Sequence, residues 1–166
     1  MPCSMVDGTP DAGSRDADVE LRSRADRGVR PSVKTLRRSK PIMTDEEKGN
    51  YQLLLELGAA FNAHDLDRIM GHFAEDSSLD MPRGSKPWGT RFAGKDAVRK
   101  GLAMRFETTP DVHYGDDRHW VSGSMGVSEW LLTGTMRDGH KVEVRGCDHY
   151  EFRGGKVIRK DLLEDR

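Results

Sequence analysis

Apolar residues between about positions 45 and 106 recur every three or four residues, which is the spacing of amphipathic helices. This spacing predicts helices over about 45–63, 66–73 and 95–106. Thr44-Asp45-Glu46-Glu47 is a capping box that begins the first helix, and Asp65 is an N-cap for the second. The first helix is expected to bury one stripe, formed by Tyr51, Leu54, Leu55, Gly58 and Phe61.

Beyond residue 110 the spacing of apolar residues changes to two, which predicts strands over 112–121, 126–136, 140–152 and 156–163. Runs 137–140 and 153–156 contain the glycines that hairpin turns favour. A brief strand is expected at 77–81, and a loop rich in Pro and Gly at 82–93. The order ααβαββββ predicts an α+β fold, in which a strongly curved antiparallel sheet is covered by three N-terminal helices around a concave cavity.

The N-terminal residues 1–42 differ from the rest in composition. They lack aromatic residues and carry nine basic and six acidic side chains, so they bury too little apolar area to fold alone. We expect a disordered tail, or else a true start at Met43, and a folded domain over 43–166. A basic arm that touches RNA is a further alternative, which the interleaved acidic residues weaken.

The whole chain has 166 residues and a net charge of −1, which argues against a dedicated nucleic-acid binder. No apolar run is long enough to span a membrane, and the N-terminus lacks the apolar core of a secretion signal. These features favour a cytoplasmic protein with no membrane partner.

Patterns for metal, nucleotide or disulfide chemistry are weak. Cys3 and Cys147 are the only cysteines and lie far apart, and the six histidines show no metal-binding spacing. Gly89–Asp96 approaches the phosphate-loop motif, but Asp96 stands where the motif needs a hydroxyl group. We therefore expect no metal site and no cofactor.

Three segments, Phe61–Asp67, Phe73–Asp76 and Gly146–Ile158, resemble the nuclear transport factor 2-like superfamily, which includes ketosteroid isomerases and SnoaL-like polyketide cyclases. The resemblance covers about 44–164. It implies a cone formed by a curved sheet, an apolar pocket inside it and often a homodimer. Members include isomerases, cyclases, dehydratases, epoxide hydrolases and proteins that only bind or dimerise, so the fold does not name the reaction.

The isomerase pattern is only partly present. The run Asp148–Phe152 matches the isomerase stretch that carries the oxyanion-stabilising Asp, which falls on Asp148. The general base falls on Met81 and the oxyanion Tyr on Leu57. Asp80 lies one position early, and one position in a strand turns a side chain to the opposite face. Steroid isomerisation by this mechanism is therefore not expected.

A different polar set follows from the same alignment. If Asp148 points into the cavity, Tyr150 does too, because residues of one parity share a face. By resemblance the inward positions on the neighbouring strands are Glu129, Leu131, Thr133 and Thr135, with Lys160, Leu162 and Glu164. We predict a polar floor of Asp148, Glu129 and Lys160, in which buried charges must pair. The alternative is that Glu129 and Lys160 are solvated and only Asp148 lies inside.

The predicted ligand-binding side chains are Tyr150, Leu131, Thr133, Leu162, Met81, Leu57 and His119. Trp130 and Leu132 have the opposite parity to Glu129 and are expected to form a homodimer interface. The protein is expected to bind a small apolar or partly polar molecule.

Two functions remain open. One is a cofactor-independent isomerase, cyclase, dehydratase or hydrolase that uses Asp148 for proton transfer or oxyanion stabilisation. The other is a non-catalytic binding or dimerisation module. A roomy pocket with at least two converging titratable groups favours the first, and a pocket plugged by Met or Leu favours the second.

Overall fold

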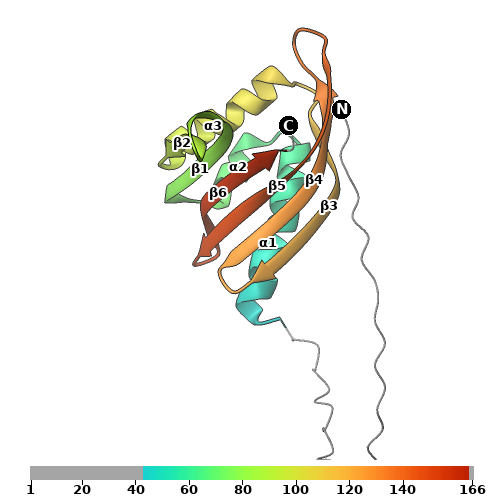
Figure 1. Cartoon of the computed structure of the whole chain (residues 1–166). Helices are drawn as coiled ribbons and strands as arrows, with labels where there is room; N and C mark the ends of the chain where they lie inside the picture. The colour runs from blue at the N-terminus through green and yellow to red at the C-terminus, as the bar shows by residue number, and fades with distance from the viewer. Residues whose placement is uncertain (1–42, 165–166) are drawn as a thin grey trace, which may run out of the picture. The chain divides into compact units, whose positions relative to one another are not determined.

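A computed structural model describes residues 43–164, and the predicted tail at 1–42 lies outside these residues. Figure 1 shows a layer of helices packed on one face of a curved sheet, so the α+β class is confirmed. The elements are α1 (Asp45–Asn62), α2 (Leu66–Gly71), β1 (Phe73–Lys86), β2 (Gly89–Ala93), α3 (Lys95–Thr108), β3 (His113–Ser122), β4 (Met125–Thr135), β5 (Lys141–Arg153) and β6 (Lys156–Glu164). Of the helices in the described residues, none is long and apolar enough to cross a membrane.

Helix α1 begins as predicted and buries a different stripe. The Thr44 hydroxyl accepts a hydrogen bond from the Glu47 backbone, and the Glu47 carboxylate accepts one from the Thr44 backbone. Tyr51 and Leu55 are exposed, contrary to the prediction. The buried stripe of α1 consists of Asn50, Leu53, Leu54, Leu57, Ala60 and Phe61. The side-chain amide of Asn50, the polar member, donates a hydrogen bond to the backbone carbonyl of Gly123.

The sheet has six strands in the order β2-β1-β6-β5-β4-β3. All neighbouring strands are antiparallel except β1 and β6, which run parallel, so the predicted sheet is antiparallel only outside this pair. The predicted loop at 82–93 is a hairpin of β1 and β2 instead. Pro82 is tolerated there because the β1–β2 register shifts between Met81 and Lys86.

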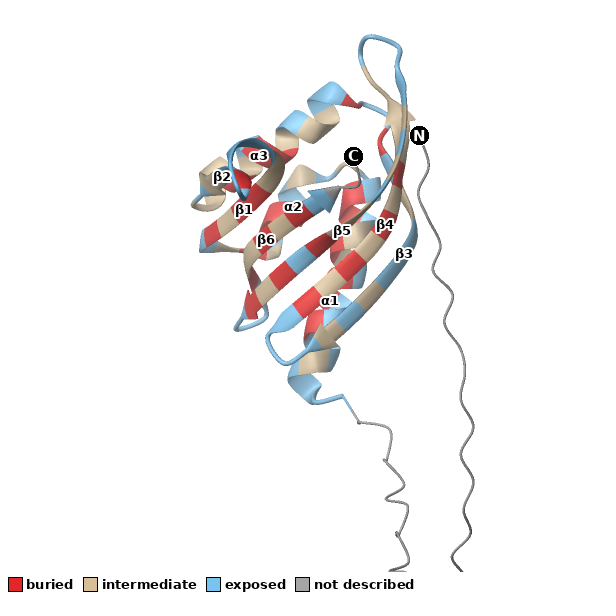
Figure 2. Ribbon diagram, viewed as in Figure 1, coloured by how far each residue is buried: buried red, intermediate tan, exposed pale blue. Residues whose placement is uncertain are grey.

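Residues on β5 face the directions that the sequence predicts. Asp148, Tyr150 and Phe152 are buried under the helices, while His149 between them is exposed on the outer face of the sheet. Figure 2 shows this alternation of buried and less buried residues along β4 and β5.

The predicted orientation of β4 is wrong. Ser128 pairs with Asp148 across the strands, and directly paired residues share a face. Trp130 and Leu132, only 5% and 0% exposed, therefore point inward and belong to the core rather than to a dimer interface. Glu129, on the other parity, points to the outer face.

Candidate functional site

Two hollows lie on the helix-covered side of the sheet. The smaller is a chamber of about 40 Å³, which has room for a few water molecules. It lies between α1 and strands β3 to β6, and its lining residues are Leu54, Gly58, Phe61, Asn62, Tyr114, Asp117, His119, Ser128, Trp130, Asp148, Tyr150 and Lys160. Four predicted site residues thus meet in this chamber: Asp148, Lys160, Tyr150 and His119.

Asp148 is the centre of the polar contacts in the chamber. Its Oδ1 forms an ion pair with the Nζ of Lys160, and the side chains are 7% and 5% exposed. Its Oδ2 accepts hydrogen bonds from the Trp130 indole at 3.0 Å and from the Tyr150 hydroxyl at 3.1 Å. The predicted pairing of an inward acid with an inward ammonium is therefore present, as burial of either charge requires.

Aromatic rings complete the environment of this ion pair. The Lys160 ammonium lies 5.3 Å from the centre of the Tyr150 ring and 5.8 Å from that of Phe61. Such distances allow a cation–π attraction. Burial, and next the neighbouring Asp148 charge, raise the pKa of the Tyr150 phenol well above its usual value. The phenol therefore stays protonated and serves as a hydrogen-bond donor.

A glycine makes the Trp130 contact possible. Gly146 is the cross-strand partner of Trp130, and a Cβ atom at Gly146 would overlap the Trp130 ring. Without a side chain at 146, the indole lies across β5 and its nitrogen reaches Asp148.

His119 joins the chamber from the edge strand β3. Its Nδ1 lies 2.8 Å from Ser128 Oγ and its Nε2 lies 3.0 Å from Asp117 Oδ2. The His119 side chain is 5% exposed, whereas that of Asp117 is 52% exposed. Sequence reasoning missed Ser128 and Asp117, although the direct pairing of His119 with Ser128 follows from the β3–β4 hairpin register.

Glu129 does not take part in the chamber. It pairs with Cys147 on the outer face of the sheet, and Leu131 and Thr133 follow it there with the same parity. The predicted polar floor of Asp148, Glu129 and Lys160 is therefore wrong in its inclusion of Glu129. The side chains of β4 alternate one residue out of step with the prediction, which places Glu129 on the opposite face of the sheet.

The larger hollow has a volume of about 660 Å³, inside the usual range for small-molecule pockets. It is formed where β1, β2, the end of α3 and the tips of β4 and β5 approach one another. Its lining residues are Met81, Pro82, Arg83, Thr90, Phe92, Met104, Arg105, Thr108, Thr109, Met136, Val142 and Val144. Among these described residues there is no Asp or Glu, so the charged groups of the wall are two guanidinium groups.

Predicted ligand residues divide between the two hollows. Met81 lines the large cavity, and Leu57 is buried in the core under α1 without lining either hollow. Leu162 and Trp130 belong to an apolar cluster that packs against Val142, Val144 and Met81 of the cavity wall. One layer of side chains thus separates the roomy cavity from the chamber that holds the titratable groups.

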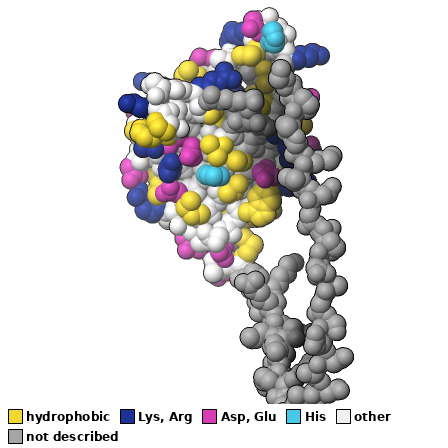
Figure 3. All heavy atoms as spheres, in the orientation of Figure 1, with side chains coloured by type: hydrophobic (Ala, Val, Ile, Leu, Met, Phe, Trp, Pro, Cys, Tyr) yellow, Lys and Arg dark blue, Asp and Glu magenta, His cyan; other side chains and the backbone are white. Residues whose placement is uncertain are grey.

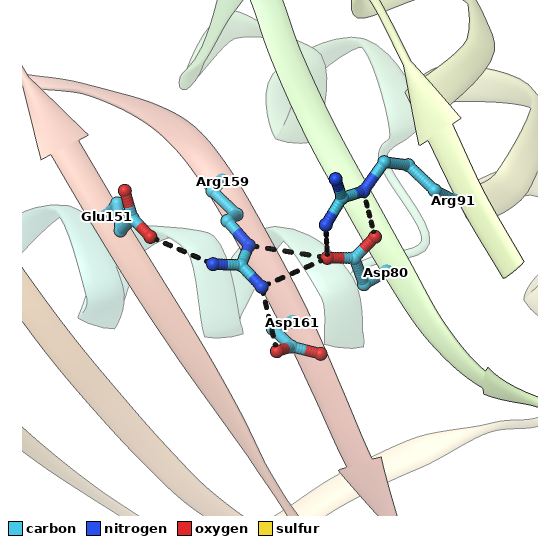
Figure 4. A network of polar contacts seen from close by, with 5 residues as sticks. All are labelled: Asp80, Arg91, Glu151, Arg159 and Asp161. Carbon is cyan, nitrogen blue, oxygen red and sulfur yellow. Dashed lines mark hydrogen bonds and ion pairs between the residues drawn. The ribbon is translucent and has the colours of Figure 1, made fainter. Parts of the chain in front are cut away.

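Asp80, which the sequence places beside the isomerase base position, lies on the outer face of the sheet. Figure 4 shows its carboxylate between two guanidinium groups. Arg91 donates to both of its oxygens at 2.6 and 2.7 Å, and Arg159 approaches Oδ2 at 3.2 Å. Arg159 also contacts Glu151 and Asp161. The hydrogen bonds from Arg91 hold the pKa of Asp80 below its usual value. Asp80 therefore links β1, β2 and β6 and does not face either hollow.

Within residues 43–164, no three His, Cys, Asp or Glu side chains are grouped so that they could hold a metal ion.

Comparisons with solved structures agree on the fold. A protein from Jannaschia sp. CCS1 that is provisionally assigned as a SnoaL-like polyketide cyclase superposes on this chain with a TM-score of 0.68 and 19% sequence identity. The match covers 76% of this chain and 92% of that protein. A phenazine biosynthesis-related protein from Pseudomonas aeruginosa superposes with a TM-score of 0.66 and 15% sequence identity, and the match covers 76% of this chain and 83% of that protein. TerC, co-crystallised with polyporic acid, superposes with a TM-score of 0.62 and 19% sequence identity, and the match covers 70% of this chain and 92% of TerC.

The family comparison covers the region that carries both hollows. The model of the SnoaL-like domain matches residues 55–160, from the middle of α1 to the lysine that pairs with Asp148. The chain therefore belongs to the SnoaL-like domain family.

Proposed function

We propose that this protein binds a small, largely apolar molecule with an anionic oxygen in the 660 Å³ cavity. The observation that carries the proposal is the composition of the cavity wall: Met, Val, Phe and Pro side chains and three threonines surround it, and among the described residues the charged groups of the wall are those of Arg83 and Arg105. Apolar walls favour a ligand that leaves water, and a guanidinium group matches the geometry of a carboxylate.

The flexibility of the wall suits a ligand of irregular shape. Met81, Met104 and Met136 contribute unbranched side chains that adapt to different surfaces. The fold relative TerC was crystallised with polyporic acid, which is a precedent for an acidic ligand on this fold.

Binding is tested by calorimetric titration with dodecanoic acid, dodecan-1-ol and dodecylamine, which share an apolar chain and differ in charge. We expect the acid to bind most tightly and the amine least. Arg105→Gln should weaken binding of the acid about tenfold while leaving the alcohol unchanged, which corresponds to loss of one charge-assisted contact. Arg118→Gln, on β3 and away from the cavity, is the matched control. Equal affinity for all three probes would contradict the proposed charge preference.

Proton transfer at Asp148 is the second candidate function. It is favoured by the convergence of Lys160, Trp130 and Tyr150 on one buried carboxylate, which orients it as a general acid–base group. Isomerisation, cyclisation, dehydration and hydrolysis all fit such a group. The layer of Leu162 and Trp130 must move for a ligand in the cavity to reach it.

The second function is tested with 4-oxododecanoic acid, whose protons beside the ketone exchange with solvent deuterium. Wild-type protein should accelerate deuterium uptake, and Asp148→Asn should remove the acceleration while the acid still binds. Asp138→Asn, in the exposed turn after β4, is the control. Uptake that is equal in wild type and Asp148→Asn would leave binding as the function.

We also propose that two copies associate through the outer face of the sheet. Trp120 and Leu163 are 50% and 45% exposed there, and Val127 and Leu131 share the face. Figure 3 presents apolar side chains gathered on the sheet side that Figure 1 shows in front of α1. Sedimentation should give a dimer that Trp120→Lys converts to a monomer. Trp88→Lys, in the exposed β1–β2 turn, should leave the dimer intact, and a monomeric wild type would overturn this proposal.

A further inference from the structure

Two threonines in the wall of the large cavity have hydroxyl groups that are bonded to the backbone. Thr90 of β2 and Thr108 of α3 both line this cavity. The Thr90 hydroxyl donates a hydrogen bond to the Arg83 carbonyl oxygen at 2.7 Å. The Thr108 hydroxyl lies 2.9 Å from the Met104 carbonyl oxygen and 3.1 Å from that of Arg105. Each hydroxyl is therefore bonded within its own part of the wall.

These bonds determine which hydrogen-bonding role each hydroxyl offers to a ligand. A threonine hydroxyl has one hydrogen and two lone pairs, whereas a carbonyl oxygen can only accept a hydrogen bond. The single hydrogen of each hydroxyl is thus directed at the backbone, and lone pairs remain for a ligand. To donate to a ligand instead, either hydroxyl would have to give up its carbonyl partner. Thr90 and Thr108 therefore act toward a ligand as hydrogen-bond acceptors.

The arginines of the wall have the opposite role, because a guanidinium group has N–H donors and no acceptor. Arg105 and Thr108 are three residues apart in α3, so their side chains lie on one face of the helix. This face presents a donor group next to an acceptor oxygen. The matching ligand group has an acceptor oxygen next to a hydroxyl hydrogen, as in a 2-hydroxy carboxylate.

We propose that Thr108 is a specificity-determining residue, which accepts a hydrogen bond from the hydroxyl group of an apolar 2-hydroxy acid while Arg105 binds the carboxylate. This inference rests on the proposed binding of an acid in the cavity, and it adds the class of acid. Thr108 is exposed, so its oxygen is open to water before a ligand binds. An acid without a hydroxyl group covers this oxygen and leaves it without a donor, which lowers the affinity. A ligand hydroxyl replaces the lost hydrogen bond.

The selection is tested by calorimetric titration with three acids of equal chain length, namely dodecanoic acid and both enantiomers of 2-hydroxydodecanoic and 2-fluorododecanoic acid. The fluoro acid has a substituent of similar size and no hydrogen to donate. We expect one enantiomer of the hydroxy acid to bind about three- to tenfold more tightly than dodecanoic acid, which is the effect of one net hydrogen bond. The fluoro acid should bind no more tightly than dodecanoic acid.

Variants of Thr108 assign the effect to its oxygen. Thr108→Val keeps the shape of the side chain and should remove the advantage of the hydroxy acid, while dodecanoic acid still binds and thereby shows that the cavity is intact. Thr108→Ser keeps the hydroxyl and should retain the advantage. Thr133→Val, on the outer face of β4 and away from the cavity, is the matched control and should leave both affinities unchanged.

The outcomes separate this inference from the proposed function. Equal affinities of wild type for the hydroxy and fluoro acids would overturn the selection, and an advantage that survives in Thr108→Val would overturn the role of Thr108. Neither result would alter the preference for dodecanoic acid over dodecylamine, on which the proposed function depends. Failure of every acid to bind would overturn the proposed function, and this inference with it.

Discussion

The indole nitrogen of Trp130 lies 3.0 Å from Oδ2 of Asp148 because the cross-strand partner of Trp130 is Gly146. The chamber therefore depends on a residue that has no side chain of its own. Gly146 leaves the space that the ring fills, and Trp130 belongs to the apolar cluster that packs against Met81, Val142 and Val144 of the larger cavity.

Substitution of Gly146 by Ala should displace Trp130 and break its contact with Asp148. Overpacking of this kind costs about 1–3 kcal/mol of unfolding free energy. Urea denaturation measures the loss, and Trp fluorescence in the folded state reports the movement of the ring. Gly115→Ala, on β3 with only ordinary contacts at the new Cβ, should cost less than half as much. Equal losses for both variants would contradict the packing argument.

The Asp148–Lys160 pair should behave as one unit in a double-mutant cycle. Asp148→Asn leaves the Lys160 ammonium buried without its counter-charge, and breaking a buried pair costs about 3–5 kcal/mol. The double variant Asp148→Asn, Lys160→Met removes both charges and should be more stable than Asp148→Asn alone. Chemical denaturation measures Asp148→Asn, Lys160→Met and the double variant. Additive losses would show that the two side chains do not interact in solution.

Acid should destabilise the protein partly through Asp80. Hydrogen bonds from Arg91 lower the pKa of Asp80 in the folded state. The contribution of Asp80 to the free energy of unfolding is therefore present above the usual Asp pKa of about 4, and it is lost as the pH falls toward the lowered pKa of the folded state. Asp80→Asn should cost about 1–3 kcal/mol near neutral pH, because two partly exposed guanidinium groups lose the negative charge and one of the two acceptor oxygens.

The same variant should flatten the acid dependence of stability. Below about pH 4 wild type should lose stability more steeply than Asp80→Asn. Asp96→Asn, at an exposed position in the first turn of α3, is the control and should retain the wild-type slope. Parallel curves for wild type and Asp80→Asn would show that Asp80 does not contribute to the pH dependence.

Alkaline titration should leave the Tyr150 phenol protonated. Because its folded-state pKa is raised above the usual value of 10.0, the associated stability is present below pH 10 and is lost as the pH rises toward the folded value. The ultraviolet phenolate signals of wild type and Tyr150→Phe should coincide until wild type unfolds. An earlier difference equal to one tyrosine would contradict the burial of this hydroxyl beside Asp148.

The sequence predicts β5 well because its polar and apolar residues differ clearly between the two faces. Asp148, Tyr150 and Phe152 alternate with charged and polar side chains. The hairpin turn with glycines at 154 and 155 pairs Phe152 with Val157, and a register shift between Glu151 and Phe152 then places Lys160 opposite Tyr150, facing inward. The inward position of Lys160 is implied by the family resemblance, because alternation counted from the turn alone would place this side chain on the outer face.

The family resemblance predicts the wrong face for the side chains of β4, whereas the hydrophobic pattern of this strand indicates the right one. Trp130 and Leu132 are larger and more apolar than Glu129 and Thr133, which already favours an inward position for the first pair. The large cavity could not be predicted from the hydrophobic pattern, because its wall combines the β1–β2 hairpin, for which the sequence predicts a loop, with the end of α3 and the tips of β4 and β5. Within β5, Val142 and Val144 alternate in step with Asp148, so the sequence indicates only that these two side chains face inward.

Small-molecule binding in the large cavity is tested most directly by a crystal structure of the protein with dodecanoic acid. The account predicts a carboxylate within about 3 Å of the Arg83 or Arg105 guanidinium and an alkyl chain along Met104, Val142 and Val144. An acid bound in the Asp148 chamber, on the outer face of the sheet, or nowhere in the crystal at saturating concentration would contradict it.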